Sequence, residues 1–313
     1  MESNRIIVTG SPHVSTRRTT RRVMLEVTLA LLPAFACGIW IFGWRSALVA
    51  AVTIIACMLT EFVCARYMLG RRDALSDCTS IVTGLLLAMT LPSSIPLPMA
   101  FIGGVFAIGV GKMAFGGTGQ NIFNPALVGR VFLLISFPVE MTTWPLPLSP
   151  DGLTGATVLS AMKESGLDAS SIDIAQMALG NMGGSLGEVG AIALVAGWIY
   201  LTLRRIIRLV IPLSILGAVA IAAAVTGNDI AVELLSGGLL LGAIFMATDY
   251  VTSPMTTKGM LVYGILIGLI TFVIRHYGSY PEGISFAILI MNGCTPLINK
   301  LTRPRVFGER RKK

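Results

Sequence analysis

The sequence predicts an all-α polytopic membrane protein with ten transmembrane helices, arranged as two inverted five-helix repeats. Three observations predict this fold class. Apolar residues make up 54% of the 313 residues and charged residues only 13%, about half the charged share of a typical soluble domain. Apolar runs recur along the whole chain. Lysine and arginine gather on one side of those runs, as they do in membrane proteins.

The helices are expected where apolar runs are long enough to cross a bilayer, which takes about 20 residues. Two runs, 79–91 and 126–138, are short and flanked by proline, which is typical of interrupted helices near a pathway. A thin or tilted helix is the alternative for both. The ten runs are 23–42, 46–68, 79–91, 98–115, 126–138, 190–203, 209–226, 232–248, 260–275 and 283–298.

The basic residues predict which side of the membrane each loop occupies. With the N-terminus inside, 21 of the 24 lysines and arginines fall on the cytoplasmic side, and only Arg45, Lys163 and Arg275 fall outside. Both termini are therefore expected in the cytoplasm. The chain then divides into a basic arm (1–22), a first repeat (23–138), an extracytoplasmic interval (139–189), a second repeat (190–298) and a basic tail (299–313).

An internal repeat is expected because five helices precede the long interval and five follow it. An odd number of helices in each half means that the two repeats have opposite orientations. Residues 83–96 and 238–254 are both apolar segments that end in threonine and proline. Residues 103–117 resemble 263–278 in position and glycine spacing.

Composition and motifs exclude several function classes. The basic residues that give the net charge of +8 lie beside the ends of predicted helices, where the positive-inside rule explains them, so no nucleic-acid partner is expected. Five cysteines show no C-x-x-C spacing, and the two histidines, His13 and His276, lie far apart, so no metal site, iron–sulfur cluster or disulfide is expected. The segment GGTGQN lacks the context of a nucleotide-binding fingerprint. We therefore expect no complete active site in this chain alone.

Ionisable residues in or beside apolar runs usually have a function or a partner. We expect Lys112 and Arg275 to extend toward the membrane surface, because both lie near helix ends. Asp249 either caps or pairs locally or binds the translocated cation, and the local role is favoured. Asn124 and Asn121 either order a loop or line an ion pathway. The ionisable residues in this class are Glu61, Asp77, Lys112, Asp249 and Arg275.

The longest polar interval contains the segment DGLTGATVLS at 151–160. Its glycines leave the backbone accessible, and an aspartate after proline favours a turn. Thr157 presents a hydroxyl at the start of a predicted helix, but no histidine, lysine or carboxylate stands at a fixed close spacing to activate it. A hydroxyl modified by another enzyme fits better than a nucleophile. A helix N-cap at Thr154 is the structural alternative.

This segment resembles the acceptor motif for covalent FMN, D-G-x-[ST]-G-A-T. In that chemistry an exported flavin transferase takes FMN from FAD and links it through a phosphoester to the last threonine, which here is Thr157. The extracytoplasmic position inferred from the arginines agrees with this resemblance. The matching residues are Asp151, Gly152, Thr154, Gly155, Ala156 and Thr157.

Nearly the whole chain resembles one family, which contains the D subunit of the Rnf ion-translocating oxidoreductase and the B subunit of the sodium-pumping NADH:quinone oxidoreductase. The short stretch before the first helix favours the Rnf branch. The resemblance implies a urea-transporter-like fold and a flavoprotein subunit that relays electrons between ferredoxin and NAD, coupled to Na⁺ or H⁺ transport. The segments that carry it are SPHVSTRRTTRRVM, VTGLLLAMTLP, FGGTGQNIFNPALVGRVF, GGSLGEVGA, FMATDYVTSP and YPEGISFAILIMNGCTPLI.

The resemblance also implies cofactors and partners. They are covalent FMN, a second and noncovalent flavin such as riboflavin, the other Rnf subunits, a flavin transferase and the lipid bilayer. Gly183, Gly184 and Glu188 are candidates for contact with a flavin, since glycine permits close backbone approach. A flexible lead into the sixth helix is the alternative. Two other functions stay open, namely the B subunit of the sodium-pumping enzyme and a passive channel of the urea-transporter kind.

Overall fold

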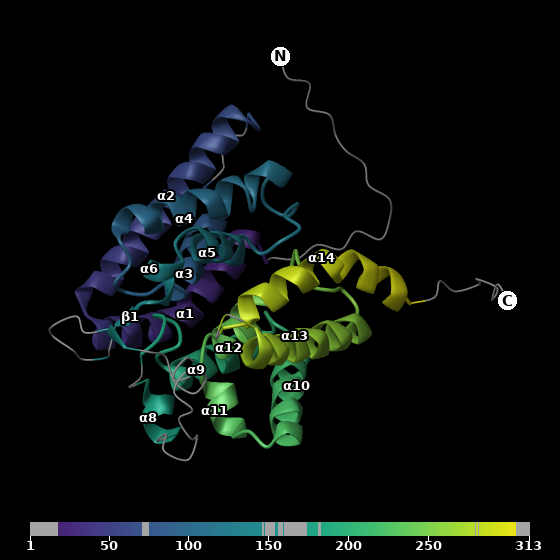
Figure 1. Cartoon of the computed structure of the whole chain (residues 1–313). Coiled ribbons are helices and arrows are strands. Elements are labelled where there is room, and N and C mark those ends of the chain that lie inside the picture. Colours follow the sequence, from purple (N-terminus) through teal and green to yellow (C-terminus); the bar gives the residue numbers. More distant parts are fainter. Residues whose placement is uncertain are drawn as a thin grey trace, which may run out of the picture.

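The computed structural model describes residues 18–70, 75–145, 147, 154–155, 159, 174–180, 183–278, 280 and 282–304. Helices make up nearly all of their regular structure (Figure 1), which confirms the all-α class. Within these described residues, five helices are long and apolar enough to cross a membrane, and four more are apolar but shorter. The chain is a multi-pass membrane protein.

The first half of the chain forms two long helices followed by shorter ones. The short ladder that follows them is antiparallel and pairs Trp144 with Gly155. The elements are α1 (Thr20–Phe42), α2 (Trp44–Tyr67), α3 (Thr79–Met89), α4 (Leu97–Gly109), the 3-10 turn η1 (Met113–Phe115), α5 (Pro125–Ser136), α6 (Pro138–Thr142), β1 (Trp144–Pro145) and β2 (Thr154–Gly155).

The second half contains longer helices and one segment, residues 230–246, that is divided into three short helical pieces. Its elements are α8 (Ile174–Leu179), α9 (Ala191–Leu203), α10 (Val210–Thr226), α11 (Ile230–Leu235), α12 (Leu239–Leu241), the π-helix η3 (Gly242–Met246), α13 (Thr257–Tyr277) and α14 (Ile284–Thr302).

Side-chain caps fix where several helices begin. Thr19 accepts a hydrogen bond from the backbone N–H of Arg22 at the start of α1. Asn124 caps α5, whose first residue is proline, and Asp229 and Thr256 cap α11 and α13. Each cap satisfies backbone donors that have no partner within the helix. Polar residues at the ends of apolar runs therefore set the helix boundaries.

The two halves of the chain occupy separate parts of the molecule. Figure 1 shows α1–α6 (purple to teal) together and α10–α14 (green to yellow) together. In the first half, α2 packs against α3 and α4, and α4 packs against α5. In the second half, α10 packs against α11 and α13, and α13 packs against α14. The halves meet where α1 contacts α9 and where α5 contacts α14.

Small residues allow the central helices of each half to approach closely. A Cβ on Gly104 of α4 would lie 2.8 Å from the Cβ of Ala56 on α2. A Cβ on Gly268 of α13 would lie 2.7 Å from the Cβ of Ala218 on α10. Glycine facing alanine is the common way in which membrane helices pack backbone against backbone. Each half thus contains a pair of helices that approach closely through a glycine and an alanine.

The predicted span 232–248 is not one helix, so that prediction is wrong. The chain breaks at Ser236–Gly238, where Gly237 has φ +63°, and continues as α12 and the π-helix η3. The side chain of Arg275 donates to the carbonyl oxygen of Ser236 at 2.8 Å, so the break is held from a neighbouring helix. Hydrophobicity marks this segment as apolar but does not reveal that a buried arginine competes for its carbonyls.

Residues 183–190 form a loop that packs between α3 and α12. The backbone N–H of Gly187 donates to the carbonyl oxygen of Met89 at 2.6 Å, just where α3 ends. A Cβ on Gly187 would lie 2.7 Å from the side chain of Leu241 in α12. Gly187 therefore lets the loop touch both α3 and α12.

The described loops gather on two opposite faces. On the first, here called the arginine face, Arg18 donates to the carbonyl oxygen of Arg205 at 3.2 Å, and the backbone N–H of Met255 donates to Asn299 at 3.0 Å. This face therefore holds the start of α1, the α9–α10 turn and the end of α14.

The second face, here called the motif face, holds the other ends of the helices. Ser94 donates to the carbonyl oxygen of Thr143, which precedes β1, at 3.1 Å. Asn228 and His276 lie 2.8 Å apart, measured between Nδ2 and Nε2, and join the ends of α10 and α13. Each of α1, α10 and α13 thus runs from the arginine face to the motif face.

Replacing Gly268 by alanine should destabilise the protein by about 1–3 kcal/mol, the usual cost of overpacking. The added methyl group would meet Ala218 at 2.7 Å. Gly217 of α10 is the matched control, because a Cβ there meets nothing within 4 Å. Gly217→Ala should leave stability unchanged or raise it by up to about 1 kcal/mol. Thermal unfolding of the detergent-solubilised proteins measures both, and equal midpoints would contradict this packing.

Candidate functional site

Most of the FMN acceptor motif predicted from the sequence lies outside the described residues, but the chain is described on both sides of Thr157. Asp151, Gly152, Ala156 and Thr157 are outside. Thr154 and Gly155 form β2, which pairs with β1 and ties the centre of the motif to the end of α6. Thr154 therefore lies in a strand, and the expectation that it caps a helix is wrong.

Leu159 places the C-terminal side of the motif against the second half of the molecule. A Cβ on Gly237 would lie 3.0 Å from the Cδ1 of Leu159 and 3.1 Å from the Nη2 of Arg275. The absence of a side chain at Gly237 therefore leaves room for both groups. Of the described residues, Gly155 thus pairs with β1, and Leu159 lies beside the α11–α12 turn.

Arg275 is the centre of a buried polar network beside Leu159. Its Nη1 donates to the backbone oxygen of Glu233 at 2.7 Å and to Oε2 of the same residue at 3.0 Å. Its Nη2 donates to the carbonyl oxygen of Ser236. The side chains of Arg275 and Glu233 are only 2% and 4% exposed, so loss of either partner would leave an uncompensated charge inside the protein.

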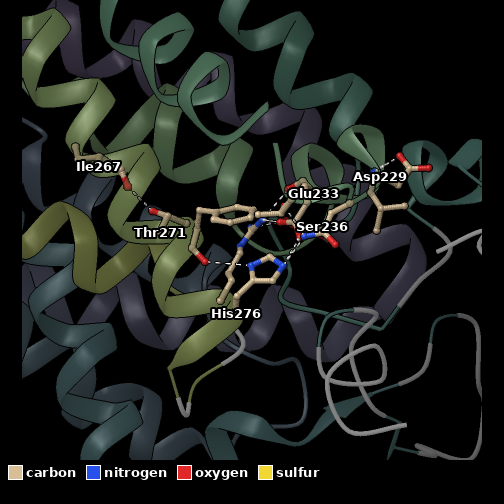
Figure 2. A network of polar contacts seen from close by, with 11 residues as sticks. Asp229, Glu233, Ser236, Ile267, Thr271 and His276 are labelled. Atoms are coloured by element: carbon tan, nitrogen blue, oxygen red, sulfur yellow. Dashed lines mark hydrogen bonds and ion pairs between the residues drawn. The ribbon is translucent and has the colours of Figure 1, made fainter. Parts of the chain in front are cut away.

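His276 extends this network toward the surface. Figure 2 shows its ring beside Glu233, and the two side chains approach to 3.5 Å, measured from Nε2 to Oε1. The ring stacks on Phe272 with centroids 4.2 Å apart, and Nδ1 lies 3.1 Å from the carbonyl oxygen of Phe272. Glu233 therefore faces two basic side chains, one buried and one partly exposed.

A second buried ion pair joins Arg130 of α5 to Glu282, the residue two positions before α14. Glu188 lies in the same region and accepts a hydrogen bond from Ser185 at 2.9 Å. Burial raises the pKa of Glu188, while the charge of Arg130 opposes this shift. A Cβ on Gly184 would lie 2.3 Å from Oε2 of Glu188. Gly184 thus makes room for this carboxylate, and flavin contact by Gly183, Gly184 and Glu188 stays a prediction.

The first half contains a corresponding buried pair. Lys112, just after α4, donates to Oε1 of Glu61 at 2.5 Å and to the hydroxyl of Thr79 at 2.6 Å. The side chains of Lys112 and Glu61 are 3% and 2% exposed. The expectation that Lys112 and Arg275 extend to the membrane surface is therefore wrong. Both are held inside because carboxylates from other helices meet them there.

The residues predicted as ion-pathway candidates share a small cavity that opens near the arginine face. Asp249 and Asn124 line it, together with Asn121 and Lys112, and its volume is about 110 Å³. Asp249 accepts a hydrogen bond from Thr252 at 3.2 Å, which is the local pairing expected from the sequence. Asn124 donates to the carbonyl oxygen of Met246 at 3.1 Å and so fixes the end of the π-helix.

Sequence reasoning missed the partners of the buried charges. Glu233 and Glu282 are not among the predicted site residues, and Arg130 is predicted only as one of the cytoplasmic basic residues. The available signal was that Glu61 and Glu233 lie within predicted spans and Glu282 lies at the edge of one, each of which calls for a basic partner elsewhere in the sequence. No group of three or more potential metal ligands occurs within the described ranges, and all five cysteines are free.

Comparison with known proteins gives full-length matches. A family model described as the NQR2, RnfD, RnfE family matches residues 7–308. The chain is 44% identical to the D subunit of the Na⁺-translocating ferredoxin:NAD⁺ oxidoreductase complex of Acetobacterium woodii, over 98% of this chain and 97% of that protein.

Two further relatives show similar coverage. The D subunit of the ion-translocating oxidoreductase complex of Stutzerimonas stutzeri is 41% identical, over 93% of both chains. The D subunit of the proton-translocating ferredoxin:NAD⁺ oxidoreductase complex of Clostridium ljungdahlii is 39% identical, over 99% of this chain and 98% of that protein.

Replacing Arg275 by methionine should destabilise the protein by about 3–5 kcal/mol, because Glu233 would keep a buried charge without its partner. The double variant Arg275→Met, Glu233→Gln should recover a large part of that loss, since no buried charge is left uncompensated. Arg66→Met is the control for arginine removal at an exposed position and should change stability by less than about 0.5 kcal/mol. Thermal unfolding distinguishes these results, and a single variant as stable as the control would refute the role of the pair.

Proposed function

The chain belongs to the NQR2, RnfD, RnfE family, and from this we propose that it is the D subunit of an ion-translocating ferredoxin:NAD⁺ oxidoreductase complex. The observation that carries the proposal is the match to D subunits over nearly the whole length of both chains. In this role the chain has other Rnf subunits as partners in the cell membrane. It forms part of a redox-driven ion translocase and carries no catalytic residue of its own.

Covalent FMN on Thr157 is the proposed redox centre of this subunit. The motif from Asp151 to Thr157 supports it, as does the way the described residues hold the motif on both sides. β2 fixes Gly155 to the end of α6, and Leu159 packs beside Gly237. Anchoring at two points would restrict where a flavin attached between them can lie. The flavin supplies a centre that exchanges electrons with both one-electron and two-electron carriers.

The proposed topology places both termini in the cytoplasm and the motif outside. The arginine face then faces the cytoplasm, in agreement with positive-inside retention, and the motif face is accessible to an exported flavin transferase. Two inverted five-helix repeats of the urea-transporter kind are supported by the matching helix contacts of the two halves. A buried basic residue at the end of both α4 and α13, Lys112 and Arg275, supports the same repeat.

A second, noncovalent flavin such as riboflavin is the other cofactor proposed for this chain. The cavity that contains Asp249 and Asn124 has polar lining residues but a volume of only about 110 Å³, below the ~300–1,000 Å³ of typical small-molecule sites. The described side chains would have to move to admit an isoalloxazine ring. The cavity is large enough for a partly hydrated cation, so Asn124 and Asp249 stay ion-pathway candidates, although the hydrogen bond from Thr252 favours the local role of Asp249.

Two alternative functions are less well supported. A passive channel of the urea-transporter kind has no use for the acceptor motif. The B subunit of a sodium-pumping NADH:quinone oxidoreductase belongs to the same family. The three relatives described above, however, are D subunits of ferredoxin:NAD⁺ or ion-translocating oxidoreductase complexes, which favours the D subunit.

Thr157→Ala should abolish covalent FMN, because alanine has no hydroxyl to form the phosphoester. Assembly should survive, since the substitution removes only one hydroxyl and one methyl group, while electron transfer through the complex should fall sharply. Thr154→Ala is the matched control, because it retains the acceptor oxygen and should reduce rather than abolish flavin. Peptide mass spectrometry of the 151–163 region measures whether each variant carries the FMN adduct. An FMN-sized adduct that persists in Thr157→Ala would exclude this residue as the acceptor.

Asp249→Asn tests the local role of this carboxylate against cation binding. Because Asp249 accepts from Thr252 within its own turn, we expect lower assembly yield and an unchanged dependence of turnover on the coupling ion. Covalent FMN on Thr157 should stay in place. Titration of the assembled complex with Na⁺ provides the measurement. A normal yield with a clear shift in ion affinity would instead assign Asp249 to the ion pathway.

A further inference from the structure

Five arginines from two distant parts of the sequence surround one recess on the arginine face. Its first hollow, about 560 Å³, is lined by Arg18, Arg22, Arg204 and Arg205. A neighbouring hollow of about 930 Å³ shares Arg18 and Arg205 and adds Arg208. We refer to the two hollows together as the arginine recess.

The positive-inside rule explains why basic residues lie on this face, but it does not explain why these arginines are held in a defined arrangement. Arg18 donates to the carbonyl oxygens of Arg205 and Arg204 at 3.2 and 3.3 Å and joins the start of α1 to the α9–α10 turn. Arg205 has φ +53°, a left-handed conformation that glycine or asparagine adopts more easily. The chain thus maintains an unfavourable backbone angle at a position that lies between the two hollows.

The charge of the recess is strongly positive. Among the described residues that line it, Glu26 is the one acidic side chain. Its carboxylate accepts from Arg204 at 2.8 and 3.1 Å and lies 3.4 Å from the side chain of Arg22. One carboxylate against five guanidinium groups leaves a large excess of positive charge. Guanidinium groups bind phosphate well because their planar donors match its oxygens.

The surroundings of the recess are apolar and face outward. Leu25 and Leu29 of α1 are 47% and 53% exposed, and Leu203 of α9, beside the first hollow, is 78% exposed. Leu209 and Leu213 are exposed in the same way beside the second hollow. A ligand that fits must combine anionic groups with apolar chains, which describes a membrane phospholipid and not a soluble phosphate or an acidic peptide.

We propose that the arginine recess binds an anionic phospholipid with two phosphate groups, of the cardiolipin type, one phosphate in each hollow. The shared residues Arg18 and Arg205 lie between the two phosphates, and the acyl chains follow the exposed leucines of α1, α9 and α10. Basic pockets beside transmembrane helices are suited to such headgroups. The lipid fixes the α9–α10 turn against the start of α1, at the contact between the two halves of the molecule.

The test uses the full-length chain, delipidated in detergent and titrated with cardiolipin, phosphatidylglycerol or phosphatidylethanolamine under native mass spectrometry. The wild type should retain one cardiolipin, bound more tightly than the other two lipids. Arg18→Gln with Arg208→Gln should weaken cardiolipin binding about 25-fold, from ~1 kcal/mol for each basic residue near an anionic lipid. Arg18→Lys with Arg208→Lys should retain most of the binding because it keeps the charge.

The matched control is Arg66→Gln with Arg303→Gln, which removes two exposed arginines at other helix ends. It should bind cardiolipin as the wild type does. Binding that is unchanged in the Arg18, Arg208 glutamine variant, or equally weakened in the control, would overturn the proposal. So would phosphatidylethanolamine binding as tightly as cardiolipin. If the glutamine variant kept the lipid but, when co-produced with the other subunits, no longer co-purified with them, the recess would be a protein-docking surface and not a lipid site. None of these outcomes depends on the flavin.

Discussion

The requirement that a charge inside a membrane protein be paired determines much of this structure. Lys112 lies just after α4 and Arg275 lies in the last turn of α13, and each meets a buried carboxylate, Glu61 or Glu233. Both also bind a short helical segment: Lys112 through the side chain of Thr79 at the start of α3, and Arg275 through the carbonyl of Ser236 before α12. An uncompensated charge there would cost several kcal/mol, so the pairs hold the broken helices in place.

These pairs relate the fold to its proposed redox role. Arg275 holds the α11–α12 turn, and Gly237 in that turn packs beside Leu159. Leu159 therefore lies against a part of the protein that is fixed by a buried ion pair. On the opposite face, Arg18 joins the start of α1 to the α9–α10 turn. In the proposed function, the motif face holds the flavin and the arginine face meets the charged surface of the bilayer.

The sequence predicts helices well and buried contacts poorly. The expected run 23–42 agrees closely with α1 (Thr20–Phe42), because apolar length and polar caps are local properties. The run 232–248 is broken because Arg275, distant in sequence, binds the carbonyl oxygen of Ser236. Lys112 was expected at the surface because its position near a helix end is visible in the sequence, while its partner Glu61 on another helix is not. The proposed function rests on the resemblance to a known family, because hydropathy and charge alone cannot identify a residue that accepts a flavin.

The measurement that tests the central claim most directly is flavin fluorescence of the denatured wild-type chain in a gel, with and without co-production of a flavin transferase. If FMN is bound covalently, it survives denaturation, so we expect a fluorescent band at the mass of this chain only when the transferase is present. A chain that stays dark with an active transferase, in a complex that still reduces NAD⁺ with ferredoxin, would contradict it.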